Sequence, residues 1–335
     1  MIQEKNKKVF LGGCAFLTLA VLIVTPLIGI ETISPRAVLD PVRGGADFRL
    51  FWQLRFPRVL VAMLAGSGLA ISGMAYQALF RNPMATPFTL GISSGASLGA
   101  ALFVSSGLSF SLLGVSGLSL AAFTGSIVSI IFVYGFTRVS RGFSTTTMLL
   151  AGIAASFFFS SVILFLQYMS DFTQSFLILH WLMGGLGVVG YRSVLDVIPF
   201  VLSGGAITVA LTHELNLLVS GEEIAVSRGV NVVRVRKMIF FATSLMVGGI
   251  VAIAGPIGFV GMMVPHICRM ILGPDHRHLI PASLLLGGAF LAVCDAVART
   301  LIAPAEIPVG VITGLLGGPF FVWLLLRHRE DRLIF

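Results

Sequence analysis

Charged residues are scarce in this sequence: Asp, Glu, Lys and Arg make up only 11% of its 335 residues. In soluble globular domains about 25% of residues are charged. Hydrophobic residues make up 56%, and one soluble core cannot hide this excess, because single cores stop growing at roughly 250–300 residues. The composition therefore excludes an ordinary soluble domain and indicates a protein embedded in lipid.

Catalytic and nucleotide-binding motifs are also missing. The four lysines are Lys5, Lys7, Lys8 and Lys237, and none follows a glycine, so the chain has no P-loop ATPase of its own. Neither G-x-S-x-G nor H-E-x-x-H occurs, which weakens the alternative of a membrane-embedded enzyme. Almost all carboxylates fall between the apolar runs, whereas an ion-coupled secondary transporter would need several inside them. These absences favour a conduit driven from outside the chain, with no catalytic residue of its own.

Metal-binding patterns are equally few. Cys14, Cys268 and Cys294 form no C-x-x-C pair, so neither a disulfide framework nor a zinc site is indicated. His266 follows Pro265 in an apolar segment and could bind a metal. Because ligation normally needs convergent partners, a histidine hydrogen-bonded inside a helix bundle is the favoured interpretation. We expect no metal and no cofactor bound by this chain.

Apolar runs of spanning length dominate what the sequence does contain. A membrane helix needs about 17–25 mostly apolar residues. An all-α polytopic protein with a single transmembrane domain, 1–335, is expected, and its ten predicted spans are 9–30, 57–80, 88–107, 112–137, 145–168, 191–213, 236–255, 258–273, 279–301 and 307–327. The apolar stretch from Phe176 to Leu186 is too short to span and should re-enter the membrane or lie at its surface.

The distribution of basic residues predicts the orientation. The net charge is +8, which in a soluble protein would suggest nucleic-acid binding. Here the basic residues lie in short loops between apolar runs, so they indicate membrane orientation and no nucleic-acid partner. Ten spans place both termini on one side, and most of the 22 Lys and Arg residues are cytoplasmic if that side is the cytoplasm. The first apolar run is too long for a signal peptide and lacks an A-x-A site, so it is expected to stay as a helix.

Arginines on the outer side are the exception to this rule. Five fall in the first outer loop: Arg36, Arg43, Arg49, Arg55 and Arg58. Such arginines can anchor a helix end to lipid phosphates or can contact an acidic partner. Asp295 and Arg299 are four residues apart near the outer end of a predicted span, which predicts an ion pair on one helix face; the alternative makes Arg299 an outward contact.

The most polar cytoplasmic loop, 214–235, contains Gly221-Glu222-Glu223-Ile224-Ala225-Val226-Ser227-Arg228-Gly229-Val230. Ile224 and Val226 lie between charged residues on either side, and a glycine stands near each end. This pattern predicts a short amphipathic helix at the membrane surface, resting on a partner. The alternative is a solvated connector.

Nine short motifs follow one another between about residues 50 and 327. They are Arg55–Arg58, Leu69–Gly73, Asn82–Pro87, Leu90–Gly95, Trp181–Gly185, Gly221–Glu223, Gly258–His266, Asp275–Arg277 and Glu306–Gly310. This ordered set resembles the FecCD-type permeases, which are subunits of ABC importers for iron–siderophores, haem and vitamin B12.

The resemblance implies a fold and a set of partners. The fold would be like that of the vitamin B12 permease, with ten helices and cytoplasmic coupling helices in a cytoplasmic (inner) membrane. The partners would be a second copy of the chain, two ATPase subunits that use ATP and Mg²⁺, and an outer periplasmic or lipoprotein binding protein.

The resemblance also implies roles for individual residues. Coupling to the ATPase would fall to Gly221, Glu222, Glu223, Ile224, Ala225, Arg228 and Gly229; docking of the binding protein to Arg55, Arg58 and Arg299; and the cytoplasmic gate to Asn82, Met84, Thr145 and Thr146. The expected cargo is an iron chelate, specifically an Fe(III)–siderophore, with haem and vitamin B12 as the alternatives.

Overall fold

The fold is all-helical apart from one small hairpin. The computed structural model describes residues 4–34, 38, 45–139 and 144–327. Within these ranges seven helical segments are long and apolar enough to cross a membrane. Two are composite: α1 (Glu4–Val24) continues into the short η1 (Thr25–Leu27), and α3 (Gly45–Arg49) continues through the π-helical η2 (Leu50–Arg55) into α4 (Phe56–Phe80). The other five are α6 (Gly117–Val139), α7 (Thr145–Met169), α9 (Arg192–Ala210), α12 (Val232–Ala254) and α14 (His276–Thr300).

Shorter elements complete the bundle. Three further helices are apolar and shorter: α5 (Ile92–Ser105), α13 (Val260–Leu272) and α15 (Val309–Arg327). The apolar part of α15 is Val309–Leu324. The others are η3 (Pro87–Leu90), the hairpin β1 (Ser111–Leu112) and β2 (Val115–Ser116), α8 (Phe172–Leu182), α10 (Thr212–Ser220) and α11 (Glu222–Ser227). Every predicted span thus overlaps an apolar helix, and the expectation of an all-α, B12-permease-like fold is confirmed. That all ten cross the membrane stays a prediction.

The helix bounds differ from three predicted segments for local reasons. The segment 112–137 begins with the hairpin, because Leu113 and Gly114 both adopt positive φ, and the helix starts after Ser116, whose hydroxyl accepts the Ser119 N–H as an N-cap. The segment 88–107 starts with the 3₁₀ turn η3, and the helix α5 begins only after Gly91, which has φ +77°. The loop 214–235 is mostly helix, since it holds most of α10, all of α11 and the start of α12.

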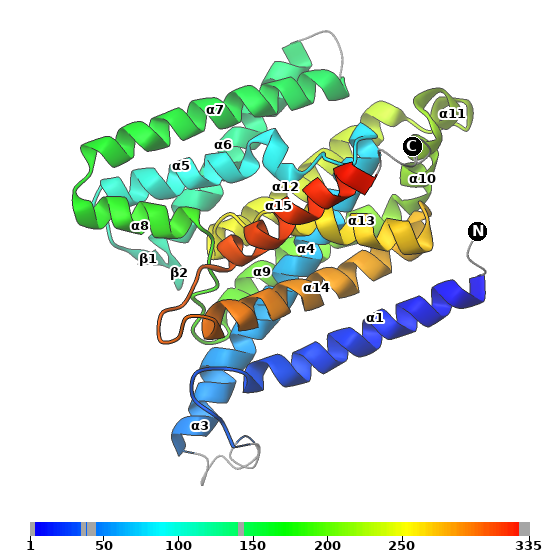
Figure 1. The fold of residues 1–335 in the computed structure, drawn as a ribbon. Coiled ribbons are helices and arrows are strands. Elements are labelled where there is room, and N and C mark those ends of the chain that lie inside the picture. Colours follow the sequence, from blue (N-terminus) through cyan, green and yellow to red (C-terminus); the bar gives the residue numbers. More distant parts are fainter. Residues whose placement is uncertain (1–3, 35–37, 39–44, 140–143, 328–335) are drawn as a thin grey trace.

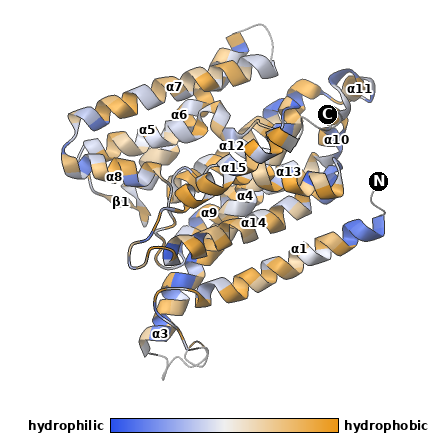
Figure 2. Cartoon of the chain, in the orientation of Figure 1, coloured by the Kyte–Doolittle hydropathy of each residue, from blue (hydrophilic) through white to orange (hydrophobic). Residues whose placement is uncertain are grey.

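The helices divide into an inner and an outer set. In the most apolar window of each helix, 83% of residues are buried for α4, 72% for α12 and 61% for α14, against 22% for α1 and α7. Figure 2 shows apolar residues along the lengths of the helices and polar residues at their ends, as at the start of α1. Since α1 and α7 remain apolar yet exposed, their outer faces are suited to lipid.

Glycines let the inner helices approach backbone to backbone. A Cβ atom on Gly66 of α4 would clash with the carbonyl oxygen of Gly287 in α14, and one on Gly73 would clash with that of Gly261 in α13. Without a hydrophobic driving force between helices in lipid, such close van der Waals packing is a main source of association. The line of small residues on α4 therefore fixes how α13 and α14 lie against it.

The two ends of the bundle differ in their elements. The start of α1, the end of α15, α10 and α11 lie at one end, on the right in Figure 1, whereas α3 and the C-terminal end of α14 lie at the other. These are called the α11 end and the α3 end below.

Candidate functional site

A buried carboxylate organises the arginines at the α3 end. Asp295, in the last turns of α14, is fully buried. Arg58, in the first turn of α4, donates from Nε to both of its oxygens at 3.1 Å and from Nη2 to Oδ1 at 3.0 Å. Arg299 lies one helical turn beyond, and its Nε is 3.1 Å from Oδ2. The ion pair predicted between Asp295 and Arg299 is present, and Arg58 joins it.

Arg55 and Arg299 donate to carbonyl oxygens in η1 and in the segment that follows it. The last carbonyls of a helix lack intrahelical partners and carry partial negative charge. Arg55 donates to the carbonyl oxygens of Glu31 at 2.6 Å and Leu27 at 3.4 Å. Arg299 donates to those of Ile28 at 3.3 Å and Thr25 at 3.4 Å. Both arginines point into the protein and are only 7% and 5% exposed, whereas the family resemblance implies that both contact a binding protein.

Arg58 joins the buried carboxylate to an exposed one. Its Nη1 donates to Oε2 of Glu306 at 2.8 Å, and the Glu306 side chain is 50% exposed against 14% for Arg58. Both residues line a pocket of about 520 Å³, which Glu31, Arg55 and Arg299 also border. The sequence-based reasoning did not connect Arg58 with Asp295 or Glu306, because residues more than 200 positions apart leave no local signal.

The two carboxylates contribute differently to stability. Removing one partner from a buried ion pair typically costs about 3–5 kcal/mol, because a charge is left without compensation. An exposed pair contributes only about 0–1 kcal/mol. Asp295 is therefore part of the framework, whereas the contact between Glu306 and Arg58 can break at little cost.

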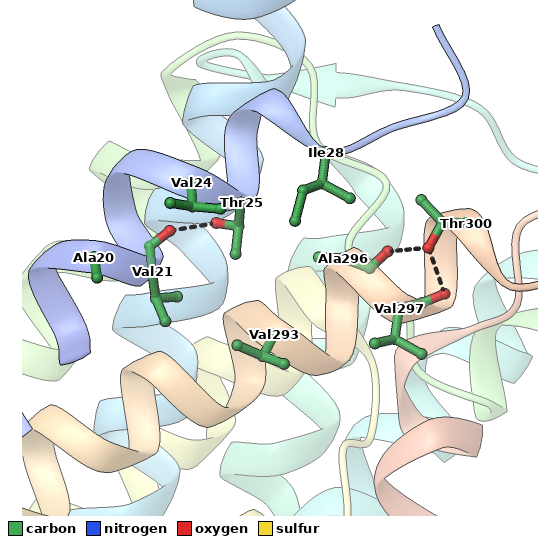
Figure 3. Close-up of a pocket in the computed structure, with 9 residues that line it drawn as sticks. All are labelled: Ala20, Val21, Val24, Thr25, Ile28, Val293, Ala296, Val297 and Thr300. Carbon is green, nitrogen blue, oxygen red and sulfur yellow. Dashed lines mark hydrogen bonds between the residues drawn. The ribbon is translucent and has the colours of Figure 1, made fainter. Parts of the chain in front are cut away.

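A second pocket, between α1 and α14, is apolar. It measures about 320 Å³ and is lined by Ala20, Val21, Val24, Thr25, Ile28, Val293, Ala296, Val297 and Thr300 (Figure 3). Its two hydroxyls are already bonded within their own helices, Thr25 to the Val21 carbonyl at 2.8 Å and Thr300 to that of Ala296 at 2.9 Å. The protons of both hydroxyls are therefore already used, and the other seven lining residues are apolar.

The short helix α11 lies within the predicted coupling segment. Gly221 and Gly229, with φ +138° and +82°, bracket it, and these angles favour glycine. Ala225 is fully buried, whereas Ile224 and Val226 are 47% and 58% exposed. The predicted amphipathic helix is present, but its inward contact is Ala225. The two larger apolar side chains face outward, as at a protein interface.

Two polar contacts hold α10 and α11 against the bundle. Glu222 of α11 pairs with Arg236 of α12 at 2.6 Å. Asn216 of α10 donates from Nδ2 to Asp275 at 2.9 Å, and its Oδ1 accepts the backbone N–H of His276 at 2.9 Å. Asp275 is the N-cap of α14, so Asn216 ties α10 to the helix whose other end carries Asp295. The sequence-based reasoning did not single out Asn216.

The four predicted gate residues lie on two segments at the α11 end. Asn82 and Met84 follow α4, where Asn82 Oδ1 accepts the Met84 N–H at 2.9 Å and the Met84 side chain is 54% exposed. Thr145 and Thr146 begin α7. The two segments are joined through η3, because Gly152 of α7 packs against the backbone of Thr89 and Leu90. Within the described residues no direct bond links the two pairs.

No group of three or more His, Cys, Asp or Glu side chains able to hold a metal occurs in the part of the chain that the structure describes. His266 packs edge-on against Phe320 of α15, with ring centroids 6.2 Å apart.

Comparison with known proteins identifies the family. The model of the FecCD transport family matches residues 17–327. The chain belongs to the FecCD transport family. Among its FecCD relatives, the hemin transport system permease HmuU of Yersinia pestis is 37% identical over 97% of both chains. The vitamin B12 import permease BtuC of Escherichia coli O9:H4 is 39% identical over 98% of both.

Two further FecCD relatives agree. The ABC transporter permease YvrB of Bacillus subtilis is 40% identical, over 84% of this chain and 80% of YvrB. A solved structure described as an inward-facing conformation of a metal-chelate type ABC transporter superposes with a TM-score of 0.84 at 33% identity, covering 95% of this chain and 98% of that one. The chain is thus an ABC importer permease of the FecCD family.

Proposed function

We propose that this FecCD permease forms a homodimer that imports an Fe(III)–siderophore across the cytoplasmic membrane, driven by two separate ATPase subunits and supplied by an outer binding protein. In this arrangement the α11 end, with both chain termini, faces the cytoplasm and the α3 end faces outward. ATP and Mg²⁺ are used by the ATPase, and this chain binds no cofactor.

The observation that carries the energy-coupling part is the exposure of α11. This short helix presents Ile224 and Val226 to solvent at the end opposite the arginine cluster. A chain without a P-loop needs a contact through which ATP hydrolysis elsewhere can act. This amphipathic helix is held by the Glu222–Arg236 pair, and the preceding α10 is held by Asn216, so α11 is suited to enter a cleft of an ATPase. Gly221, Glu223, Arg228 and Gly229 belong to the same proposed contact.

The cluster at the α3 end supports docking of a binding protein with acidic side chains. Arg58 lines the pocket and donates from Nη1 to the half-exposed Glu306. Arg55 and Arg299 hold the end of α1 and so shape the pocket. Their part in docking is therefore to position the surface. At the other end, Asn82, Met84, Thr145 and Thr146 are proposed to form the cytoplasmic gate.

A siderophore is proposed as cargo because the superposed structure is described as metal-chelate type. Haem and vitamin B12 are the alternative cargoes, supported by the names of the Yersinia and Escherichia relatives. Titrating the binding protein encoded beside this gene with ferric siderophores, hemin and cobalamin separates the three. Submicromolar binding of hemin or cobalamin without siderophore binding would replace the proposed cargo.

The coupling part is tested by reconstitution. The permease alone in liposomes is expected to hydrolyse no ATP and to accumulate no cargo, whereas the complex with its ATPase does both. Uphill uptake by the permease without another subunit would overturn the proposal.

A further inference from the structure

Glu306 covers Nη1 of Arg58 at the pocket of the α3 end. It lies in the short connection between α14 and α15, and the backbone on either side is fixed. The Ala305 N–H donates to the Ile302 carbonyl at 3.0 Å, and the Ile307 N–H donates to that of Ala298 at 3.1 Å. The carboxylate can therefore leave Arg58 by rotating its side chain alone.

The guanidinium of Arg58 divides its contacts between two unequal carboxylates. Nε and Nη2 face Asp295, which is fully buried and is shared with Arg299. Nη1 faces Glu306, which is half exposed and makes one contact with Arg58. An approaching acidic side chain can displace the exposed carboxylate, whereas displacing Asp295 would leave a buried charge without its arginine.

We propose that Glu306 is an internal competitor for docking: it occupies Nη1 of Arg58 until an Asp or Glu side chain of the binding protein takes its place. This inference rests on the proposed docking of a binding protein at the α3 end. The exchange keeps Arg58 paired before and after docking, and it releases Glu306 into solvent. Removing the charge of Glu306 should therefore strengthen docking, whereas removing the charge of Arg58 should weaken it.

The test measures docking in nanodiscs that hold the complete permease–ATPase complex. The probe is the binding protein encoded beside the permease gene, labelled with a fluorophore, and association and dissociation rates are measured at about 50 mM and about 500 mM salt. Glu306→Gln preserves the size of the side chain. It is expected to slow dissociation of the binding protein about two- to fivefold, which is the range for the loss of one exposed ion pair that competes with docking. The slowing is expected at both salt concentrations.

Glu31→Gln is the matched control. Glu31 borders the same pocket, so this variant removes the same charge and leaves the pair between Arg58 and Glu306 in place. Its expected effect is a faster association at low salt only, because long-range attraction is screened at high salt. If both variants behave alike, the effect of Glu306 is general charge and the competitor role is wrong.

A double-mutant cycle separates this inference from the proposed docking. Arg58→Gln leaves Asp295 paired with Arg299, so the variant can fold, and it should weaken docking. In the Arg58→Gln background, Glu306→Gln should no longer slow dissociation, because its target is absent. If Arg58→Gln leaves docking unchanged, the docking site itself is wrong. If Arg58→Gln weakens docking while Glu306→Gln has no effect or speeds dissociation, only the competitor role is overturned.

Discussion

Arg58 and Asp295 are 237 positions apart in the sequence, yet two nitrogens of the Arg58 guanidinium contact the buried carboxylate at 3.0–3.1 Å. This contact joins the start of α4 to the end of α14. It determines how the α3 end is held together and which charges remain for a partner.

Asp295→Ala is expected to destabilise the protein strongly. The change leaves Arg58 and Arg299 mostly buried without their shared carboxylate, a loss of about 3–5 kcal/mol. Unfolding in detergent measures it. Asp196→Ala is the control, since Asp196 pairs with the 54% exposed Arg192 and should cost less than about 1 kcal/mol. Equal effects of the two variants would contradict a structural role for the buried cluster.

Gly73→Ala is expected to loosen the contact between α4 and α13. The new methyl group would meet the backbone of Gly261, which cannot move aside as a side chain can, and overpacking of this kind costs about 1–3 kcal/mol. Gly135→Ala in α6 is the matched control, because a Cβ there meets nothing within 4 Å. That control should be neutral or slightly stabilising, since alanine favours helix. Thermal unfolding of both variants decides the matter, and a stable Gly73→Ala protein would argue against close backbone packing.

Ala225→Pro is expected to uncouple transport from ATP hydrolysis. Proline removes the Ala225 N–H, which donates to the Gly221 carbonyl at 3.0 Å, and it disrupts α11. Ala225→Ser keeps this N–H and serves as the control. ATP hydrolysis and cargo uptake are measured side by side in liposomes. Normal uptake by the proline variant, with the ATPase still bound, would show that α11 is not the coupling element.

The cap of α14 predicts a pH dependence of stability. Burial raises the pKa of Asp275, but hydrogen bonds from the Arg277 backbone and the Asn216 side chain, with the nearby charges of His278 and Arg277, outweigh it and hold the pKa below its usual value. Its folded-state pKa is therefore below the unfolded one. The resulting stabilisation is present above the unfolded value, about 3.9, and is lost as the pH falls through the folded value.

Asp275→Asn keeps a capping side chain and removes this titration. The variant should be less stable than the wild type at pH 7, and the difference should shrink in acid. Unfolding temperatures measured from pH 7 down to about pH 3 test this. A difference that stays constant across the range would mean that the Asp275 charge plays no part.

The sequence by itself determined the helices and the class of protein. A continuous apolar run can satisfy its own backbone groups in lipid only as a helix, since barrel strands alternate apolar with polar residues and bond to neighbouring strands, so each run predicted a helix. The pair of Asp295 and Arg299 was also predictable, because residues four apart share a face on any α-helix. The ordered motifs were sufficient to indicate the FecCD family, which the match over residues 17–327 establishes.

Only the tertiary structure decided what the charged side chains do. The backbone contact of Gly66 with Gly287 sets α4 against α14, and that packing brings Arg58 to Asp295 and Glu306. The segment from η1 to Glu31 arrives beside them, and Arg55 and Arg299 turn inward and donate to its carbonyl oxygens. Sequence periodicity predicts which residues share a face of one helix, whereas the partner of a buried charge depends on which other segment of the chain packs against it in the fold.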